Sequence, residues 1–403
     1  MTPQYNTKWY SLSGIWFGGI VSVPALLVGS TLIHSLSFSN ALWAGFIGFN
    51  IVVLFMSLLS VSAVIHRKST VSLASSSFGS KGAAVIVGLV IGISTLGWFG
   101  IQTNIAGASF AKILLEINGI HIPVWLSSIC WGILMVITAV FGFTYVKWLN
   151  YIAVPAIIIL LAYAMYITFQ NHSWEDILCF QPTEKMSLLQ AIGFTIGFIS
   201  VGGVISADYN RFAASKKDAI LGSILGIVPS AMCLLAIGGI LAITQETYDI
   251  VTIFSSLGFP FLAMSILILA TWTSNVMNIY SSGLAFNNLF QLSDKNRSKT
   301  TLIIGGIGIG LAAAGVLSQF MNFITFLTIT ITPIAGVMIS DFYLSKTYTE
   351  TPAKINWNGI ISWLIGVTVM IFMDSEIKNI LGILIAMLSY FILQKTIKNE
   401  TNK

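Results

Sequence analysis

GFTIGFISVGGVISADYNRF, residues 193 to 212, is the stretch that decides the expected fold of this chain. It is apolar enough to span a membrane, yet it contains four glycines, each of which costs a helix about 1 kcal/mol relative to alanine. In hydrocarbon a helix is interrupted only where the freed backbone groups face protein, water or a ligand. We therefore predict a discontinuous span here. Close helix packing through small residues is the alternative explanation.

A similar stretch lies near the start of the chain. Phe17-Gly-Gly-Ile-Val-Ser22, followed by Pro24, resembles Val201-Gly-Gly-Val-Ile-Ser206, and each belongs to the first apolar run of its half of the chain. Interrupted helices at corresponding positions of two halves indicate a transporter site near the bilayer midplane.

The composition is that of a multi-pass membrane protein. Of 403 residues, 56% are hydrophobic and 8% are charged, and the mean hydropathy is +0.89, whereas charged residues make up about a quarter of a soluble domain. The first apolar run has no small-residue cleavage site, so we expect a retained helix rather than a signal peptide. The three cysteines form no CxxC pair, which argues against a metal framework or a disulfide scaffold.

Twelve apolar stretches are long enough to cross about 30 Å of hydrocarbon. They are residues 12–34, 41–64, 83–113, 123–144, 147–169, 189–207, 218–243, 254–287, 300–319, 322–344, 357–373 and 378–395. An even number of spans places both termini on one side. With that side in the cytoplasm, every one of the 19 basic residues lies inside except Lys112, Lys185 and Lys378. The positive-inside rule therefore predicts a cell (inner) membrane protein with both termini cytoplasmic.

The predicted spans hold no Asp, Glu, Lys or Arg at depth. Such charges mark proton relays and ion-pair gates, so their absence argues against a carboxylate-driven proton pump and for a substrate that is neutral or satisfied by backbone dipoles. We find no catalytic or nucleotide-binding motif, which disfavours an enzyme or a primary pump. The scattered basic residues do not suggest nucleic acid as a partner, and we infer no cofactor and no obligate protein partner.

An aromatic residue in the third span is a candidate ligand contact. Trp98 lies between Gly97 and Gly100 in mid-span, whereas tryptophan usually settles at the membrane interface. A flat ligand would have room against its face, although a packed core aromatic is the alternative. Phe198 with Ser200 could lie opposite, so that two rings stack a planar ligand while polar groups read its edge.

A polar ladder in the eighth span is a candidate cation site. Ala270, Thr273 and Ser274 stand at i, i+3 and i+4, so a helix places them on one face. One carbonyl and two hydroxyls form part of a neutral oxygen cage suited to Na⁺. Asn275 and Asn278 can each donate and accept, which suits amide or pyrimidine edges. Hydrogen bonding between helices is the alternative for the whole ladder.

Together these motifs resemble the cytosine permease branch of the nucleobase:cation symporter family. The resemblance rests on Gly97-Trp-Phe-Gly100, Phe198-Ile-Ser200, Ala207-Asp-Tyr-Asn-Arg-Phe212, Ile152-Ala-Val-Pro-Ala-Ile157, Trp272-Thr-Ser-Asn275, Tyr280-Ser-Ser-Gly-Leu284, and the run from Phe323-Ile-Thr-Phe-Leu327 through Pro333 and Gly336 to Asp341. It implies an all-α protein with a five-plus-five inverted repeat and discontinuous helices 1 and 6. The first repeat would be residues 1–169, the second 189–344, and residues 357–395 would be two extra peripheral spans.

The resemblance also implies a site. Trp98 and Phe198 would sandwich a base, with Ser200 and Asn275 near its polar edge. Sodium, the coupling ion, would be held by residues of two spans: Gly19, Ser22, Ala270, Thr273 and Ser274. Three positions depart from the family pattern: Thr95 replaces glutamine, Gly197 replaces serine, and Val276-Met277 replaces Asp-Asn. These departures leave the base open.

The predicted function is a symporter that imports a neutral planar nucleobase, cytosine or a related pyrimidine, with Na⁺ by alternating access. Hydroxymethylpyrimidine, purine or hydantoin is an alternative substrate, and proton coupling is an alternative to sodium. An amino-acid carrier of similar architecture and a receptor that binds without transporting are the remaining possibilities.

Overall fold

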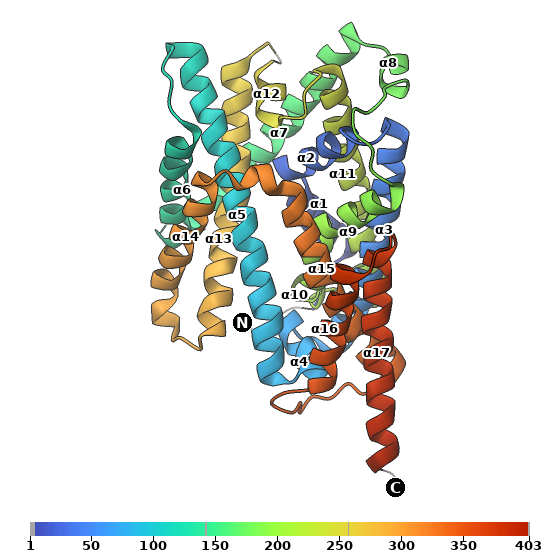
Figure 1. The fold of residues 1–403 in the computed structure, drawn as a ribbon. Coiled ribbons are helices and arrows are strands. Elements are labelled where there is room, and N and C mark those ends of the chain that lie inside the picture. Colours follow the sequence, from blue (N-terminus) through green and yellow to red (C-terminus); the bar gives the residue numbers. More distant parts are fainter. Residues whose placement is uncertain (1–4, 142, 257, 402–403) are drawn as a thin grey trace.

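The computed structural model describes residues 5–141, 143–256 and 258–401. Within these ranges the chain is almost entirely helical (Figure 1), and the extended pairing is limited to one parallel bridge between Thr7 and Ala213. The elements are α1 (Trp9–Ile20), α2 (Val23–Ile33), α3 (Phe38–His66), α4 (Thr70–Phe78), α5 (Ser80–Asn118), α6 (Val124–Phe141), α7 (Phe143–Asn171), α8 (Trp174–Leu178), α9 (Leu188–Val204), α10 (Ala207–Asn210), α11 (Lys216–Thr244), α12 (Ile250–Ser255), α13 (Pro260–Leu289), η1 (Asp294–Asn296), α14 (Arg297–Ala313), η2 (Val316–Gln319), α15 (Phe320–Ile339), η3 (Ser340–Ser345), α16 (Trp357–Phe372) and α17 (Lys378–Thr401). The predicted all-α class is observed.

The membrane-spanning helices follow the predicted order. In the described ranges nine helices are long and apolar enough to cross a membrane, and the pair α1 and α2, bent by 61°, makes a tenth. Helices α14 and α16, with 17 and 16 residues, are shorter than any of these spans. The total of twelve spans therefore stays a prediction. The predicted span 254–287 is divided into α12 and α13, because Pro260 has no N–H to continue a helix and begins a new one.

Two groups of helices form most of the molecule. Helices α1, α2, α3, α9 and α11 lie on the right of Figure 1, and α5, α6, α13 and α14 lie on the left. Helices α1 and α2 pack on α11, and α3 packs on α9. When each span is exchanged for its counterpart five positions away in the other half of the chain, the contact of spans 1 and 7 becomes that of spans 6 and 2, and the α5–α6 contact becomes the α13–α14 contact. This packing has the internal symmetry expected of a five-plus-five repeat.

The remaining helices cover these two groups. Helix α7 packs on α13, and α15 packs on α9. Helices α16 and α17 pack on each other and on α15, and the Trp363 indole donates to the Thr330 carbonyl at 2.9 Å. The division into residues 1–169, 189–344 and 357–395 stays a prediction.

The described ends of the chain lie toward one side of the molecule. The Thr7 N–H donates to the Phe212 carbonyl at 3.0 Å, and the Arg67 guanidinium donates to the Ala213 carbonyl at 2.7 Å. Helix α4 follows α3 at this side, and the lower part of α17 extends past it (Figure 1). An even number of crossings requires this arrangement.

The glycines of the sixth span do not interrupt the helix, although the sequence predicted that they would. Helix α9 runs without interruption through Gly193, Gly197 and Gly203, and the break begins two residues after Gly203, at residues 205–206. A Cβ atom at any of these three glycines would overlap with atoms of a neighbouring helix. Their absent side chains permit close packing, which is the alternative explanation of this stretch.

Candidate substrate and cation site

The break in the first span has a local chemical cause. Pro24 has no N–H, and in a continuous helix it would leave the Ile20 carbonyl without a donor and its ring would clash there. The chain bends between α1 and α2, and the Ser22 hydroxyl donates to that same Ile20 carbonyl at 3.2 Å. The last carbonyls of α1 thereby lose their helical partners. The family resemblance predicts that backbone oxygens in this region, near Gly19 and Ser22, hold sodium.

Helix α13 supplies a second set of oxygen atoms. The hydroxyls of Thr273 and Ser274 both donate to the Ala270 carbonyl at 3.0 Å, so the three predicted sodium ligands of this helix lie on one face. Thr273 and Ala270 are buried. Helix α2, which begins directly after Ser22, packs on α13. The five predicted sodium residues thus lie at the end of α1, at its junction with α2, and on α13, and sodium binding by them stays a prediction.

A hydroxyl of this set is shared with α5. Ser274 also donates to the side-chain oxygen of Gln102 at 2.5 Å. Gln102 is buried and follows Trp98 by four residues, so both side chains lie on one face of α5. The sequence analysis did not select Gln102, although its spacing from Trp98 would have indicated it. Ser274 therefore lies between the oxygen set of α13 and the Trp98 face of α5.

Trp98 lies in a cluster of aromatic rings. Its ring centroid is 5.8 Å from that of Phe198, with 77° between the planes. From α15, Phe323 and Phe320 also contact Trp98, at 5.2 and 6.1 Å, and Phe194 contacts Phe320 at 5.9 Å. The predicted neighbours Trp98 and Phe198 are close, but they meet edge to face. A planar ligand could lie between two parallel ring faces only if one of these rings turned.

The other predicted substrate residues use their polar groups within the protein. Thr95 donates to the Ile91 carbonyl at 2.9 Å, and Ser200 donates to the Gly197 carbonyl at 2.8 Å. Gly197 faces α15, where a Cβ atom would lie 2.5 Å from the Ile324 carbonyl. In this conformation Gly197 contributes to helix packing rather than to an open surface.

Asn275 is also engaged in packing. Its side chain is fully buried, and its amide nitrogen donates to the Phe99 carbonyl at 3.0 Å and the Thr103 hydroxyl at 2.9 Å. Its oxygen accepts from the Asn278 amide at 3.3 Å. These bonds join α13 to α5, which is the alternative explanation of the polar ladder. Contact between Asn275 and a base stays a prediction, and contact through the amide nitrogen would require its bonds to Phe99 and Thr103 to break.

The two sides of the candidate site differ in packing. Helix α15 closes over α9 with the aromatic cluster, and Thr328 donates to the Gly193 carbonyl at 3.1 Å. By contrast, α1 packs on α11 with one face, while Gly14, Gly18 and Gly19 have no atom within 4 Å of a Cβ position. The side of the candidate site formed by α9 and α15 is therefore sealed, whereas the face of α1 that carries these glycines is open.

Comparisons with known proteins agree with this architecture. The family model for permeases of cytosine/purines, uracil, thiamine and allantoin matches residues 3–393. The chain belongs to this permease family. The permease is 28% identical to the cytosine permease of Escherichia coli K12 over 397 residues, which cover 97% of this chain and 92% of that one. It is 22% identical to the hydantoin permease of Microbacterium maritypicum over 418 residues, with 94% and 84% covered.

The fold is similar to that of the transporter Mhp1. In an inward-facing conformation, Mhp1 matches with a TM-score of 0.85 at 19% identity, over 99% of this chain and 94% of Mhp1. The permease is thus a multi-pass membrane transporter and not an enzyme, and its fold is the one that the sequence analysis expected.

Proposed function

We propose that this permease is a secondary symporter that imports a neutral planar nucleobase together with Na⁺ by alternating access. The observation that carries the proposal is the position of the Ser274 hydroxyl, 3.0 Å from the Ala270 carbonyl and hydrogen-bonded to Gln102. A cation that binds the Ser274 oxygen would fix its proton toward Gln102. The amide of Gln102 would then be oriented on the helix face that carries Trp98, so ion binding would prepare the substrate side.

The chemistry of the site favours an uncharged ring. None of the predicted site residues has an ionisable side chain, so the substrate would be recognised by aromatic contact and by amide and hydroxyl groups. Kinship with a cytosine permease and a hydantoin permease supports a small ring with an amide edge. We favour cytosine or a related pyrimidine, and hydroxymethylpyrimidine, purine and hydantoin remain the competing substrates.

The two sides of the site support a direction of transport. Phe194 and Phe320 lie in the first turns of α9 and α15, at the helix ends remote from the paired Thr7 and Ala213. We place the termini in the cytoplasm of a cell with this protein in its inner membrane, because nearly all basic residues then lie inside. The aromatic cluster would close the outer path, and the open face of α1 would belong to the inner one.

A single Na⁺ supplies enough driving force for uptake. Moving one charge through 100 mV is worth about 2.3 kcal/mol, which corresponds to roughly fiftyfold accumulation. A sodium concentration gradient would add to this value.

The proposal is tested by binding and uptake in proteoliposomes. A competition panel of cytosine, uracil, hydroxymethylpyrimidine, adenine and hydantoin, with and without Na⁺, should identify one base whose affinity rises with Na⁺. Uptake that does not depend on Na⁺ but increases at acid external pH would establish proton coupling instead. Binding without accumulation would indicate a receptor, and displacement by a neutral amino acid would overturn the substrate class.

A further inference from the structure

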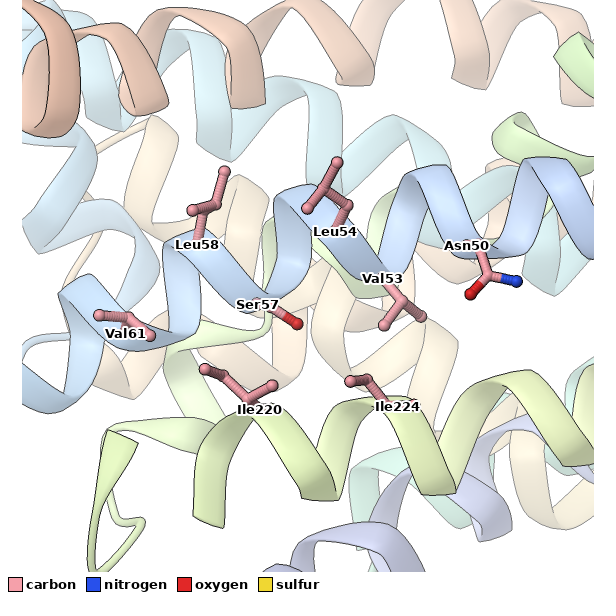
Figure 2. Close-up of a pocket in the computed structure, with 8 residues that line it drawn as sticks. All are labelled: Asn50, Val53, Leu54, Ser57, Leu58, Val61, Ile220 and Ile224. Atoms are coloured by element: carbon pink, nitrogen blue, oxygen red, sulfur yellow. The ribbon is translucent and has the colours of Figure 1, made fainter. Parts of the chain in front are cut away.

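A second candidate binding site lies on the surface of the molecule, away from the residues discussed so far. A groove of 410 Å³ runs between α3 and α11. Its lining consists of Asn50, Val53, Leu54, Ser57, Leu58, Val61, Ile220 and Ile224. Figure 2 shows Val53 and Ser57 of α3 directed toward Ile220 and Ile224 of α11. Most of these side chains are aliphatic, and Leu54 is 64% exposed, so this surface faces the hydrocarbon of a bilayer.

The groove is as long as one leaflet. From Asn50 to Val61 a helix rises roughly 16 Å, and half of the hydrocarbon core is about 15 Å. Because α3 ends at His66, the groove occupies the half of this helix nearer Arg67. Ile220 and Ile224 likewise lie in the first turns of α11. The groove therefore covers the leaflet on the side where the chain begins, which the proposed orientation makes the cytoplasmic one.

Positive charge lies at the end of the groove that reaches the membrane surface. Lys216 and Lys217 are exposed and begin α11, and Lys217 precedes Ile220 by three residues and Ile224 by seven, so they share a helix face. The adjacent carboxylate of Asp218 is turned to α1, where it accepts from the Trp9 N–H at 3.1 Å. An apolar channel with two lysines at its surface end complements a lipid with a negative head group.

We propose that this groove binds an anionic phospholipid, with one acyl chain between α3 and α11 and the phosphate at Lys216 and Lys217. A helix of a second copy is a poorer match, because such a helix would cross both leaflets whereas the groove follows one. Both α3 and α11 belong to the group of helices that carries the broken span, so the lipid would contact a part of the protein that alternating access moves. The proposal rests on membrane embedding and on the orientation of the chain, and it does not depend on substrate or coupling ion.

Native mass spectrometry of the full-length permease in detergent tests the proposal, with phosphatidylglycerol and phosphatidylcholine of equal chain length as probes. The wild type should retain one phosphatidylglycerol in preference to phosphatidylcholine. Each lysine near an anionic head group is worth about a fivefold change in affinity, so Lys216→Gln with Lys217→Gln should weaken phosphatidylglycerol binding roughly 25-fold. The matched control, Lys295→Gln with Lys299→Gln, neutralises two exposed lysines beside α14 and should leave binding unchanged.

A second variant tests the apolar part of the groove. Ile224→Trp should fill it and reduce the binding of both lipids at least fivefold, whereas Ile303→Trp on the exposed face of α14 should not. Equal retention of the two lipids, or equal loss in the lysine variant and its control, would overturn the proposal. A dimer mass that disappears in Ile224→Trp would assign the groove to a second copy. Lipid binding is measured without substrate in every case, so a failure of Na⁺-coupled uptake would not affect the result of the lipid-binding test.

Discussion

Two sets of glycines in this permease have opposite surroundings. In α9, the residues Gly193, Gly197 and Gly203 lie so close to other helices that no Cβ atom fits. In α1, Gly14, Gly18 and Gly19 have open space where a Cβ would point. The first set lets α15 and α3 approach α9, and the second set keeps one face of a broken helix clear. Glycine thus permits close helix contacts in α9 and leaves a face of α1 uncovered.

The predicted site residues belong to both regions. Trp98 and its aromatic partners lie on the sealed side, and α13, which carries the predicted oxygen ligands, packs on α2, which follows α1.

The sealed side should depend most on Trp98. Trp98→Ala removes a ring that contacts Phe198, Phe320 and Phe323, and stacking of a base on an aromatic side chain contributes about 1–3 kcal/mol to binding. We expect the affinity for the transported base to fall roughly hundredfold, measured by binding of labelled base. Trp43→Ala, at a position that is 55% exposed, is the control. Wild-type affinity in Trp98→Ala would remove this residue from the site.

The dependence of uptake on Na⁺ should rest on the side-chain oxygen atoms of α13. Thr273→Ala with Ser274→Ala removes two hydroxyls, and a bond to a charged group is worth about 1.5–3 kcal/mol. The Na⁺ concentration for half-maximal uptake should rise roughly thirtyfold. Thr271→Ala is the matched control, because its hydroxyl donates to the Leu267 and Ile268 carbonyls on another part of the same helix. An unchanged Na⁺ response in the double variant would refute the cation site.

The close contact between α9 and α15 should not tolerate a methyl group. In Gly197→Ala the Cβ would lie 2.5 Å from the Ile324 carbonyl, and overpacking costs about 1–3 kcal/mol. Uptake should fall about tenfold and the thermal unfolding temperature should drop. Gly202→Ala provides the comparison in the same helix, because the atom nearest to its Cβ is 3.7 Å away. If the two variants behaved alike, the packing explanation of these glycines would be wrong.

The open face of α1 should accept the same change. Gly18→Ala introduces a Cβ with no atom within 4 Å, and alanine favours a helix over glycine by about 1 kcal/mol. We expect uptake within about twofold of wild type and an unfolding temperature that is unchanged or slightly higher. A large loss of stability, measured by tryptophan fluorescence on heating, would show that this face packs against something in the folded state.

Much of the fold could be predicted because its causes are local. Hydropathy and the distribution of lysine and arginine located the spans, and Pro24 marked the interruption at Ser22, because a missing N–H acts on the carbonyl four residues before it. The glycines of the sixth span were interpreted less well. Glycine permits both an interrupted helix and a close contact, and only the neighbour at each position distinguishes them.

The candidate site was predictable in part. Ala270, Thr273 and Ser274 share a face because helical spacing alone requires it. The bonds of Asn275 to Phe99 and Thr103 could not be read from the ladder, since they join positions more than 170 residues apart. The same is true of the bond between Ser274 and Gln102. The same side-chain amide can bind a ligand or form a hydrogen bond to a neighbouring helix. The sequence does not show which of these partners lies next to it.

The sequence alone predicted that this protein is embedded in a membrane. It also predicted where the helices run, where the first of them is interrupted and which residues share a helix face. These properties follow from side-chain polarity, backbone donors and a 3.6-residue period, all of which act within a few residues. Only the packed structure shows which glycines are crowded and which are open, how the ring of Trp98 meets its partners, and where a groove lies between α3 and α11. Those depend on which distant helices come into contact, and packing between helices is fixed by the fit of whole surfaces rather than by any short run of residues.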